Sequence, residues 1–267
     1  MGSFWAFILG MVQGITEFLP ISSTAHLIII PYLFRIPDLG LSFDVALHLG
    51  TILAILIYFF RDWLDMILAI FKGGEKRRLF FYLIIATIPA GIFGIILDPI
   101  TEKIAQPQSY PFAIPIICIG LISFGIIFLL FERGTEKSLK ITDLNIVKAL
   151  TIGFWQVFAL FPGVSRSGST ISGGLFVGLR REESARFSFL LSLPTLLGAL
   201  LLKSYQVYKG HVSLDLSITL LGIISAFIFG ILSIKFLLSY LKRNSLRIFA
   251  YYRFILAIFL LIIYFLR

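Results

Sequence analysis

Charged residues are scarce in this sequence. Asp, Glu, Lys and Arg together make up 14% of the 267 residues, whereas they make up about 25% of an ordinary soluble domain. Hydrophobic residues make up 58%, and the mean hydropathy is +0.99. A soluble globular domain does not have this composition. The chain is therefore expected to be an integral membrane protein that forms a single domain over residues 1–267.

Cysteine is nearly absent, because Cys118 is the only one. A single cysteine excludes an intramolecular disulfide framework and offers no metal-site spacing. Basic residues outnumber acidic ones by 23 to 14, but they lie in short segments between apolar runs. That pattern is typical of cytoplasmic loops beside a membrane, and we expect no nucleic-acid partner. The N-terminus lacks a basic region and a cleavage site, so it is not expected to be a signal peptide.

Six segments have the length and apolar character of a membrane-spanning helix, which needs about 20 residues. They are 43–60, 79–97, 111–131, 187–203, 215–236 and 250–266. Two further apolar regions, 3–34 and 149–179, are each broken in the middle by proline and small polar residues. Each is too long for one span and too short for two, which favours a re-entrant helix–loop–helix hairpin. The predicted fold class is an all-α polytopic membrane protein with six transmembrane helices and two re-entrant hairpins.

The distribution of Lys and Arg predicts the orientation of the chain. The segments 61–78, 132–148, 180–186 and 235–249 carry five, four, three and four of them, whereas 98–110 and 203–214 carry one and two. The richer set is expected to be cytoplasmic. Both termini are then extracytoplasmic, and the two hairpins enter from opposite sides and meet near the midplane.

An internal repeat supports this arrangement. The stretch "GMVQGITEFLP" (10–20) resembles "GFWQVFALFP" (153–162) at an offset of 143, and "FDVALHLGTILA" (43–54) resembles "FSFLLSLPTLLG" (187–198) at an offset of 144. Each half, approximately 1–135 and 145–267, contains a hairpin and three spans. An odd number of spans inverts the second repeat, as in transporters that bind ligands at the repeat interface.

The two hairpins carry polar groups that are costly inside a membrane and are therefore candidates for function. The first hairpin contains Gln13, Glu17, Ser22, Ser23, Thr24 and His26, and the first 34 residues hold no other charge than Glu17. The second hairpin contains Gly163, Ser165, Arg166, Ser167, Gly168, Ser169 and Thr170. A guanidinium between glycines at the start of a helix, expected near Ser169, is suited to binding phosphate.

Structural roles compete with these functional ones. Ser22, Ser169 and Thr170 fit helix caps equally well. Glu17 and Arg166 can form a purely structural ion pair between the hairpins, and His26 can be a buried histidine with satisfied hydrogen bonds. For Asp44 and His48, which share a helix face at i and i+4, a structural role is the better interpretation.

The motifs "QGITEFLPISSTAH" and "PGVSRSGST" resemble the two signature motifs of the bacterial undecaprenyl pyrophosphate phosphatases, the bacitracin-resistance family. The resemblance extends through "FDVALHLGTILAIL" and "RREESARFSFLLSLP". It implies a multi-pass protein of the bacterial plasma membrane. It also implies hydrolysis of undecaprenyl pyrophosphate to the monophosphate and inorganic phosphate, which recycles the lipid carrier of peptidoglycan synthesis.

The same resemblance assigns roles to residues. The functional carboxylate of the family matches Glu17, its serine Ser23, its histidine His26 and its arginine Arg166. The first acidic position of the motif is Gln13 here, which argues against an obligatory base at that position. The family is usually regarded as needing a divalent cation, Mg²⁺ or Ca²⁺, for which Glu17 is the expected ligand.

The residues themselves leave several alternatives open. Ser23, His26 or an activated water is the nucleophile, and His26 is otherwise a general acid or base. Ser22, Thr24 and the 163–170 loop are expected to bind the phosphates of a polyprenyl pyrophosphate. A transporter or flippase for an anionic lipid or ion is the alternative function, and a lipid-binding scaffold is a weaker one. Membrane lipids are expected partners, and a homodimer is compatible with the sequence.

Overall fold

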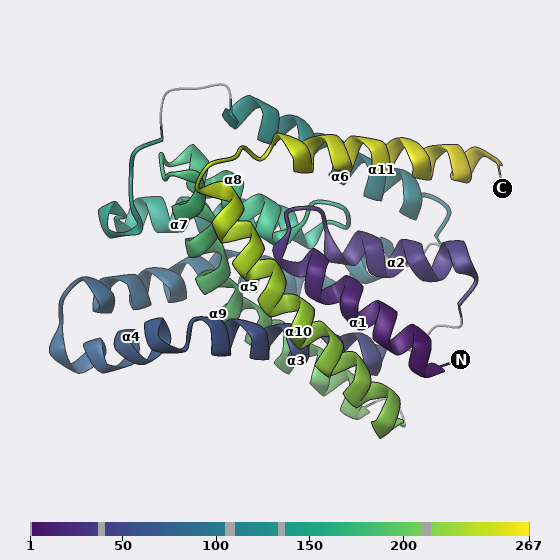
Figure 1. The fold of residues 1–267 in the computed structure, drawn as a ribbon, viewed down its shortest axis with the longest axis horizontal. Helices are drawn as coiled ribbons and strands as arrows, with labels where there is room; N and C mark the ends of the chain where they lie inside the picture. The colour runs from purple at the N-terminus through teal and green to yellow at the C-terminus, as the bar shows by residue number, and fades with distance from the viewer. Residues whose placement is uncertain (1, 37–40, 105–109, 133–136, 210–214, 267) are drawn as a thin grey trace.

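The protein is almost entirely helical. The computed structural model describes residues 2–36, 41–104, 110–132, 137–209 and 215–266 (Figure 1). The helices are α1 (Gly2–Phe18), α2 (Ser23–Phe34), α3 (Leu41–Tyr58), α4 (Phe60–Lys72), α5 (Glu75–Ile104), α6 (Ala113–Glu132), η1 (Ile141–Asp143), α7 (Ile146–Val157), η2 (Phe158–Leu160), α8 (Arg166–Phe176), α9 (Arg181–Lys209), α10 (Leu216–Leu241) and α11 (Arg247–Leu266). The described residues form no strand beyond one isolated bridge between Leu139 and Leu179. The predicted all-α fold class is confirmed.

Helices long and apolar enough to cross a membrane account for most of the chain. Among the described residues, α5, α6, α9, α10 and α11 meet that length and composition. α3 meets them only together with α4, and the two helices are bent by 73° at their junction. All six predicted spans fall on these helices. Parts of three predicted loops, at 105–109, 133–136 and 210–214, lie outside the described residues.

The segment 61–78, which the charge distribution marks as a loop, is mostly helical. α4 continues to Lys72, and only Gly73 and Gly74, both with positive φ, separate it from α5. The expectation of an irregular loop is therefore wrong. The physical reason lies in Trp63, Met66 and Ala69, whose helical spacing buries one face of α4 while the basic residues remain at the exposed positions.

The interior is polar where the hairpins meet, and the surface is apolar. The buried polar residues include Gln13, Glu17, Gln156, Ser188 and Arg253. Large hydrophobic side chains cover the outside instead; Leu201 and Phe265, for example, are 73% and 80% exposed. Water does not stabilise such a surface, whereas lipid does. The protein is therefore a multi-pass membrane protein.

The first helix of each broken region, α1 or α7, packs closely against another helix. α1 packs along α10, and α7 packs along α5. A Cβ on Gly10 would lie 2.4 Å from the carbonyl oxygen of Gly222, and one on Gly153 would lie 2.4 Å from that of Ala86. Only glycine permits these approaches. Both chain ends lie at the same end of the molecule, and α4 lies at the opposite end (Figure 1).

Candidate active site

The first break lies between α1 and α2. α1 ends at Phe18, and α2 begins at Ser23. Ser22 caps α2: its hydroxyl accepts a hydrogen bond from the backbone N–H of Ala25 at 3.3 Å, and its φ is 76°. A positive φ at a residue other than glycine is strained and recurs at functional sites. The expected cap at Ser22 is present, and the break turns Ser23 back toward the end of α1.

The second break has the same construction. Ser165 has a φ of 76°, and its hydroxyl accepts a hydrogen bond from Gly168 N–H at 3.1 Å. α8 therefore begins at Arg166, which is earlier than the expected start near Ser169. The chain turns sharply before this cap at Gly163, whose φ is 89° and where a Cβ would lie 2.2 Å from the Ile117 carbonyl oxygen. Ser22 and Ser165 are 143 positions apart, which is the offset of the sequence repeat.

The two breaks meet through a buried ion pair. Nη2 of Arg166 lies 2.9 Å from Oε1 of Glu17, and their side chains are 10% and 4% exposed. The other carboxylate oxygen of Glu17 accepts hydrogen bonds from the Ser23 hydroxyl at 2.7 Å and from the Gln13 amide at 3.2 Å. The structure thus brings together Glu17, Ser23, Arg166 and Gln13, which we call the charged centre.

Only some of the hydrogen-bond donors of the Arg166 guanidinium have partners among the described residues. Its Nη1 donates to the Ser188 carbonyl at 3.3 Å, and its buried Nε has no hydrogen-bond partner in the described part of the chain. The N-terminus of α8 adds free donors, because a helix leaves its first N–H groups without intrahelical partners. Ser165 satisfies the N–H of Gly168 through its hydroxyl and that of Ser169 through its carbonyl, so the N–H groups of Arg166 and Ser167 are left for an anion.

The other residues predicted to bind phosphate differ in what their side chains contact. Ser167 donates to the Leu19 carbonyl at 3.1 Å and so ties the two breaks together. Ser169 and Thr170 are not caps: both hydroxyls donate back to the Arg166 carbonyl inside α8, at 3.1 and 2.8 Å. Thr24 is exposed, and no hydrogen bond of the described residues joins its side chain to the charged centre.

His26 is close in sequence to the charged centre but forms its hydrogen bonds elsewhere. Its Nδ1 lies 2.7 Å from the Ser22 carbonyl oxygen, and its Nε2 lies 2.6 Å from the hydroxyl of Tyr252 on α11. Neither partner belongs to the charged centre. Tyr252 is a residue that the sequence analysis missed, because nothing in its local pattern distinguishes it from the other tyrosines.

Arg253, the neighbour of Tyr252, was also missed. It is completely buried, and its guanidinium donates five hydrogen bonds to backbone carbonyls. The acceptors lie on both breaks and on α6: Pro20, Gly163, Val164, Gly120 and Leu121. A signal was available, since Arg253 is the only charge in the predicted span 250–266 and such residues are functional by default.

Oxygen donors for a cation are few. The described residues contain no group of three or more His, Cys, Asp or Glu that could hold a metal. The carboxylate of Glu17 and the buried, unpartnered Oε1 of Gln13 are hard oxygen donors at one place. Mg²⁺ commonly binds through one or two carboxylates, with substrate phosphates and water completing its shell. These residues fit such a cation once a diphosphate is bound.

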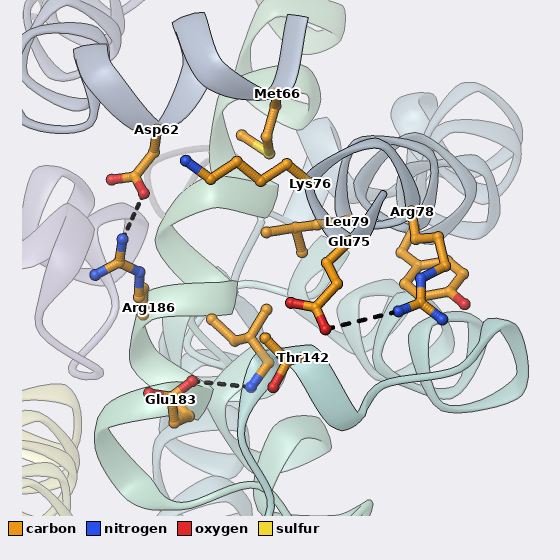
Figure 2. A pocket seen from close by; sticks show the side chains of 11 residues that line it. Asp62, Met66, Glu75, Lys76, Arg78, Leu79, Thr142, Glu183 and Arg186 are labelled. Carbon is orange, nitrogen blue, oxygen red and sulfur yellow. Dashed lines mark hydrogen bonds and ion pairs between the residues drawn. The ribbon is translucent and has the colours of Figure 1, made fainter. Parts of the chain in front are cut away.

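His48 fits the structural role expected for it. Its Nδ1 lies 2.9 Å from the backbone oxygen of Asp44, one helical turn earlier. A cavity of about 260 Å³ lies elsewhere, between α4, α5, η1 and α9 (Figure 2). Its charges are largely paired, as Arg186 with Asp62 at 2.5 Å and Glu183 with the backbone of Ile141 at 2.9 Å. None of the four residues of the charged centre lines this cavity.

Comparison with known proteins supports the sequence resemblance. A family model described as "Bacitracin resistance protein BacA" matches residues 6–259. A protein of Caldicellulosiruptor bescii named undecaprenyl-diphosphatase is 44% identical, over 100% of this chain and 99% of its own length. Proteins with the same name from Thermodesulfovibrio yellowstonii and Moorella thermoacetica are 45% and 43% identical, and each alignment covers at least 98% of both chains.

Proposed function

The chain belongs to the bacitracin resistance protein BacA family, and from this membership we propose that it is an undecaprenyl-diphosphatase. It hydrolyses undecaprenyl pyrophosphate to undecaprenyl phosphate and inorganic phosphate, and so returns the lipid carrier to peptidoglycan synthesis. The observation that supports this function best is the charged centre, where a serine hydroxyl lies 2.7 Å from a carboxylate that is paired with an arginine. The relatives do not support the alternative of a transporter.

Arg166 and the N-terminus of α8 bind the diphosphate. The unpartnered Nε of Arg166 and the free N–H groups of Arg166 and Ser167 are donors for phosphate oxygens. Phosphoryl transfer depends mostly on positioning and on neutralising the charge of these oxygens. The bridge from Arg166 to Glu17 holds the guanidinium beside Ser23, so the phosphate that Arg166 binds is presented to the serine hydroxyl.

The geometry favours Ser23 as the nucleophile. Its Oγ forms a bond to the terminal phosphorus while its proton passes to Oε2 of Glu17, the atom to which it already donates. The bridging P–O bond breaks, and undecaprenyl phosphate leaves with the electron pair. Water then attacks the phosphoserine, and Ser23 leaves with the proton held by Glu17. Ser23 donates directly to Glu17, whereas His26 forms its described hydrogen bonds with Ser22 and Tyr252, so Ser23 is the better activated nucleophile.

A divalent cation, Mg²⁺ or Ca²⁺, would be held by the Glu17 carboxylate and the Gln13 amide oxygen, together with phosphate oxygens of the substrate. It would supply positive charge at the diphosphate. This assignment is supported by Oε1 of Gln13, a buried acceptor that no donor among the described residues satisfies. Burial of such an acceptor without a partner is costly.

We further propose the complete topology predicted from the sequence. Six helices, α3, α5, α6, α9, α10 and α11, span the plasma membrane, and α1–α2 and α7–α8 are re-entrant hairpins of two inverted repeats. Two observations support this. Both chain ends lie at one end of the molecule, as an even number of spans requires (Figure 1), and Ser22 and Ser165 have the same φ and the same capping role at the repeat offset. Both termini are placed outside the cytoplasm by the Lys and Arg asymmetry.

The experiment is phosphate release by the detergent-purified protein from undecaprenyl pyrophosphate, with no membrane gradient present. We expect turnover with Mg²⁺ or Ca²⁺, loss of turnover with a chelator, and loss in Ser23→Ala. Ser204→Ala, at an exposed position of α9, is the matched control and should retain full activity. If Ser23→Ala still turns over at the wild-type rate, the nucleophile assignment fails; if the wild type releases no phosphate, the proposed function fails.

A further inference from the structure

His26 and Tyr252 form a pair that the steps above leave without a role. His26 lies in the first turn of α2 and is 8% exposed, and Tyr252 lies on α11, 226 residues later. The Tyr252 hydroxyl and Nε2 of His26 are 2.6 Å apart. Their rings are nearly parallel, with an interplanar angle of 12° and centroids 5.8 Å apart. A short hydrogen bond and a ring contact together fix the orientation of the imidazole.

The two hydrogen bonds of His26 also fix its tautomer. The Ser22 carbonyl oxygen can only accept, so the Nδ1 atom that lies 2.7 Å from it carries a hydrogen. A neutral imidazole has one N–H, and its Nε2 therefore presents a lone pair, to which the Tyr252 hydroxyl donates. The buried guanidinium of Arg253, next to Tyr252 in the sequence, favours the neutral imidazole in the resting protein, so a proton that His26 accepts is held only briefly.

A second basic group beyond Glu17 accelerates the proposed reaction. Glu17 receives the Ser23 proton in the first step and returns it when Ser23 leaves the phosphorus. Water attacks phosphorus faster when a base takes its proton in that second step, and Glu17, which is protonated at that moment, cannot take it. His26 follows Ser23 by three positions in α2, and residues at that spacing lie on the same helix face, about 5–6 Å apart at Cβ.

We propose that Tyr252 is a positioning residue for this step. Its hydroxyl holds His26 with Nδ1 protonated and Nε2 as the single basic nitrogen, beside Ser23. Because a tyrosine hydroxyl both donates and accepts, it releases Nε2 when the water gives up its proton and then accepts from the new Nε2–H. His26 passes that proton to the departing inorganic phosphate and is neutral again for the next turnover. This inference rests on the proposed function and deepens it, because it names the group through which the proton of the attacking water leaves.

The kinetic test is a double-mutant cycle. Tyr252→Phe removes the hydroxyl and keeps the ring. Tyr251→Phe is the matched control, since Tyr251 is adjacent to Tyr252 on α11 and also exposed, whereas it is the Tyr252 hydroxyl that bonds to His26. We expect Tyr252→Phe to lower kcat roughly 10-fold with KM within about 2-fold, a part of the 10²–10⁴ attributed to a general base. Tyr251→Phe should behave as wild type.

The effect of Tyr252→Phe in the wild-type protein is compared with its effect in the His26→Asn protein, to decide whether Tyr252 acts through His26. In His26→Asn, the added Tyr252→Phe change should alter kcat by less than about 2-fold, because residues that act together are not additive. A hydroxyl with a merely structural role would lower kcat by the same factor in both backgrounds, and that additivity would overturn the proposal. Wild-type kcat in Tyr252→Phe would overturn it as well.

A second measurement does not need turnover. The chain contains three histidines, so ¹⁵N-histidine labelling of the wild-type protein in detergent gives few resonances, of which His26→Asn identifies one set. We expect a protonated Nδ1 and an unprotonated, hydrogen-bonded Nε2 for His26. A proton on Nε2 with a bare Nδ1 overturns the inference. Because this result does not depend on phosphate release, it separates failure of the inference from failure of the proposed function.

Discussion

Replacing Arg166 with lysine tests whether the ion pair of the charged centre serves catalysis or only structure. Arg166 donates from Nη2 to Glu17 at 2.9 Å and from Nη1 to the Ser188 carbonyl at 3.3 Å, and its Nε is buried without a partner. The single ammonium of a lysine can keep the contact with Glu17. It loses the planar group that reaches Glu17, Ser188 and a phosphate oxygen at once.

The expected loss of catalytic rate follows from the guanidinium N–H donor that lysine lacks. Removing one preorganised donor from a developing oxyanion costs about 10²–10³ in rate, or about 2.7–4 kcal/mol. Because phosphate charge is stabilised more in the transition state than in the bound substrate, most of the loss should appear in kcat, with a smaller rise in KM. We therefore expect Arg166→Lys to retain about 1% of wild-type kcat or less.

The assay is steady-state phosphate release from a polyprenyl pyrophosphate by purified protein, with thermal unfolding as the folding control. Arg243→Lys, at an exposed position after α10, is the matched substitution and should leave kcat unchanged. A folded Arg166→Lys protein that keeps more than about half of wild-type kcat would show that lysine replaces arginine in a structural pair. That result would refute the assignment of Arg166 to the phosphates.

Three further predictions concern other features of the molecule. Glu17→Gln should fold and insert but release no phosphate, because an amide cannot take the Ser23 proton; phosphate release near the wild-type rate would contradict the assignment of Glu17. Arg253→Met should destabilise the protein by about 3 kcal/mol or more, because it leaves buried carbonyls of both breaks without donors. The measurement is Tm, which should fall. An unchanged Tm would show that these hydrogen bonds contribute little. A cysteine at position 74, in a Cys118→Ala background, should resist a membrane-impermeant thiol reagent added outside intact cells, and labelling there would reverse the proposed orientation.

The membrane class and most of the helices could be predicted from the sequence, because they depend on local composition. Apolar runs of spanning length mark the six long helices, and proline with small polar residues marks the two breaks. Glu17 and Arg166 were found in the same way, as isolated charges in apolar regions. The segment 61–78 was wrongly predicted to be a loop, because that prediction used its charges alone. The spacing of Trp63, Met66 and Ala69 indicates the helix that is present.

The groups in the broken regions follow from the sequence alone: one carboxylate and one guanidinium, with serines beside them. How these groups pair, and that the helix after the second break begins at Arg166, depends on tertiary packing. So does the support that Tyr252 and Arg253 give to the breaks from α11. His26 and Tyr252 are 226 residues apart, and Arg253 and Pro20 are 233. A local pattern does not contain contacts of that range, because they depend on the packing of α11 beside α6 and both breaks. Composition places a charge in the membrane, but only packing determines the atom that neutralises it.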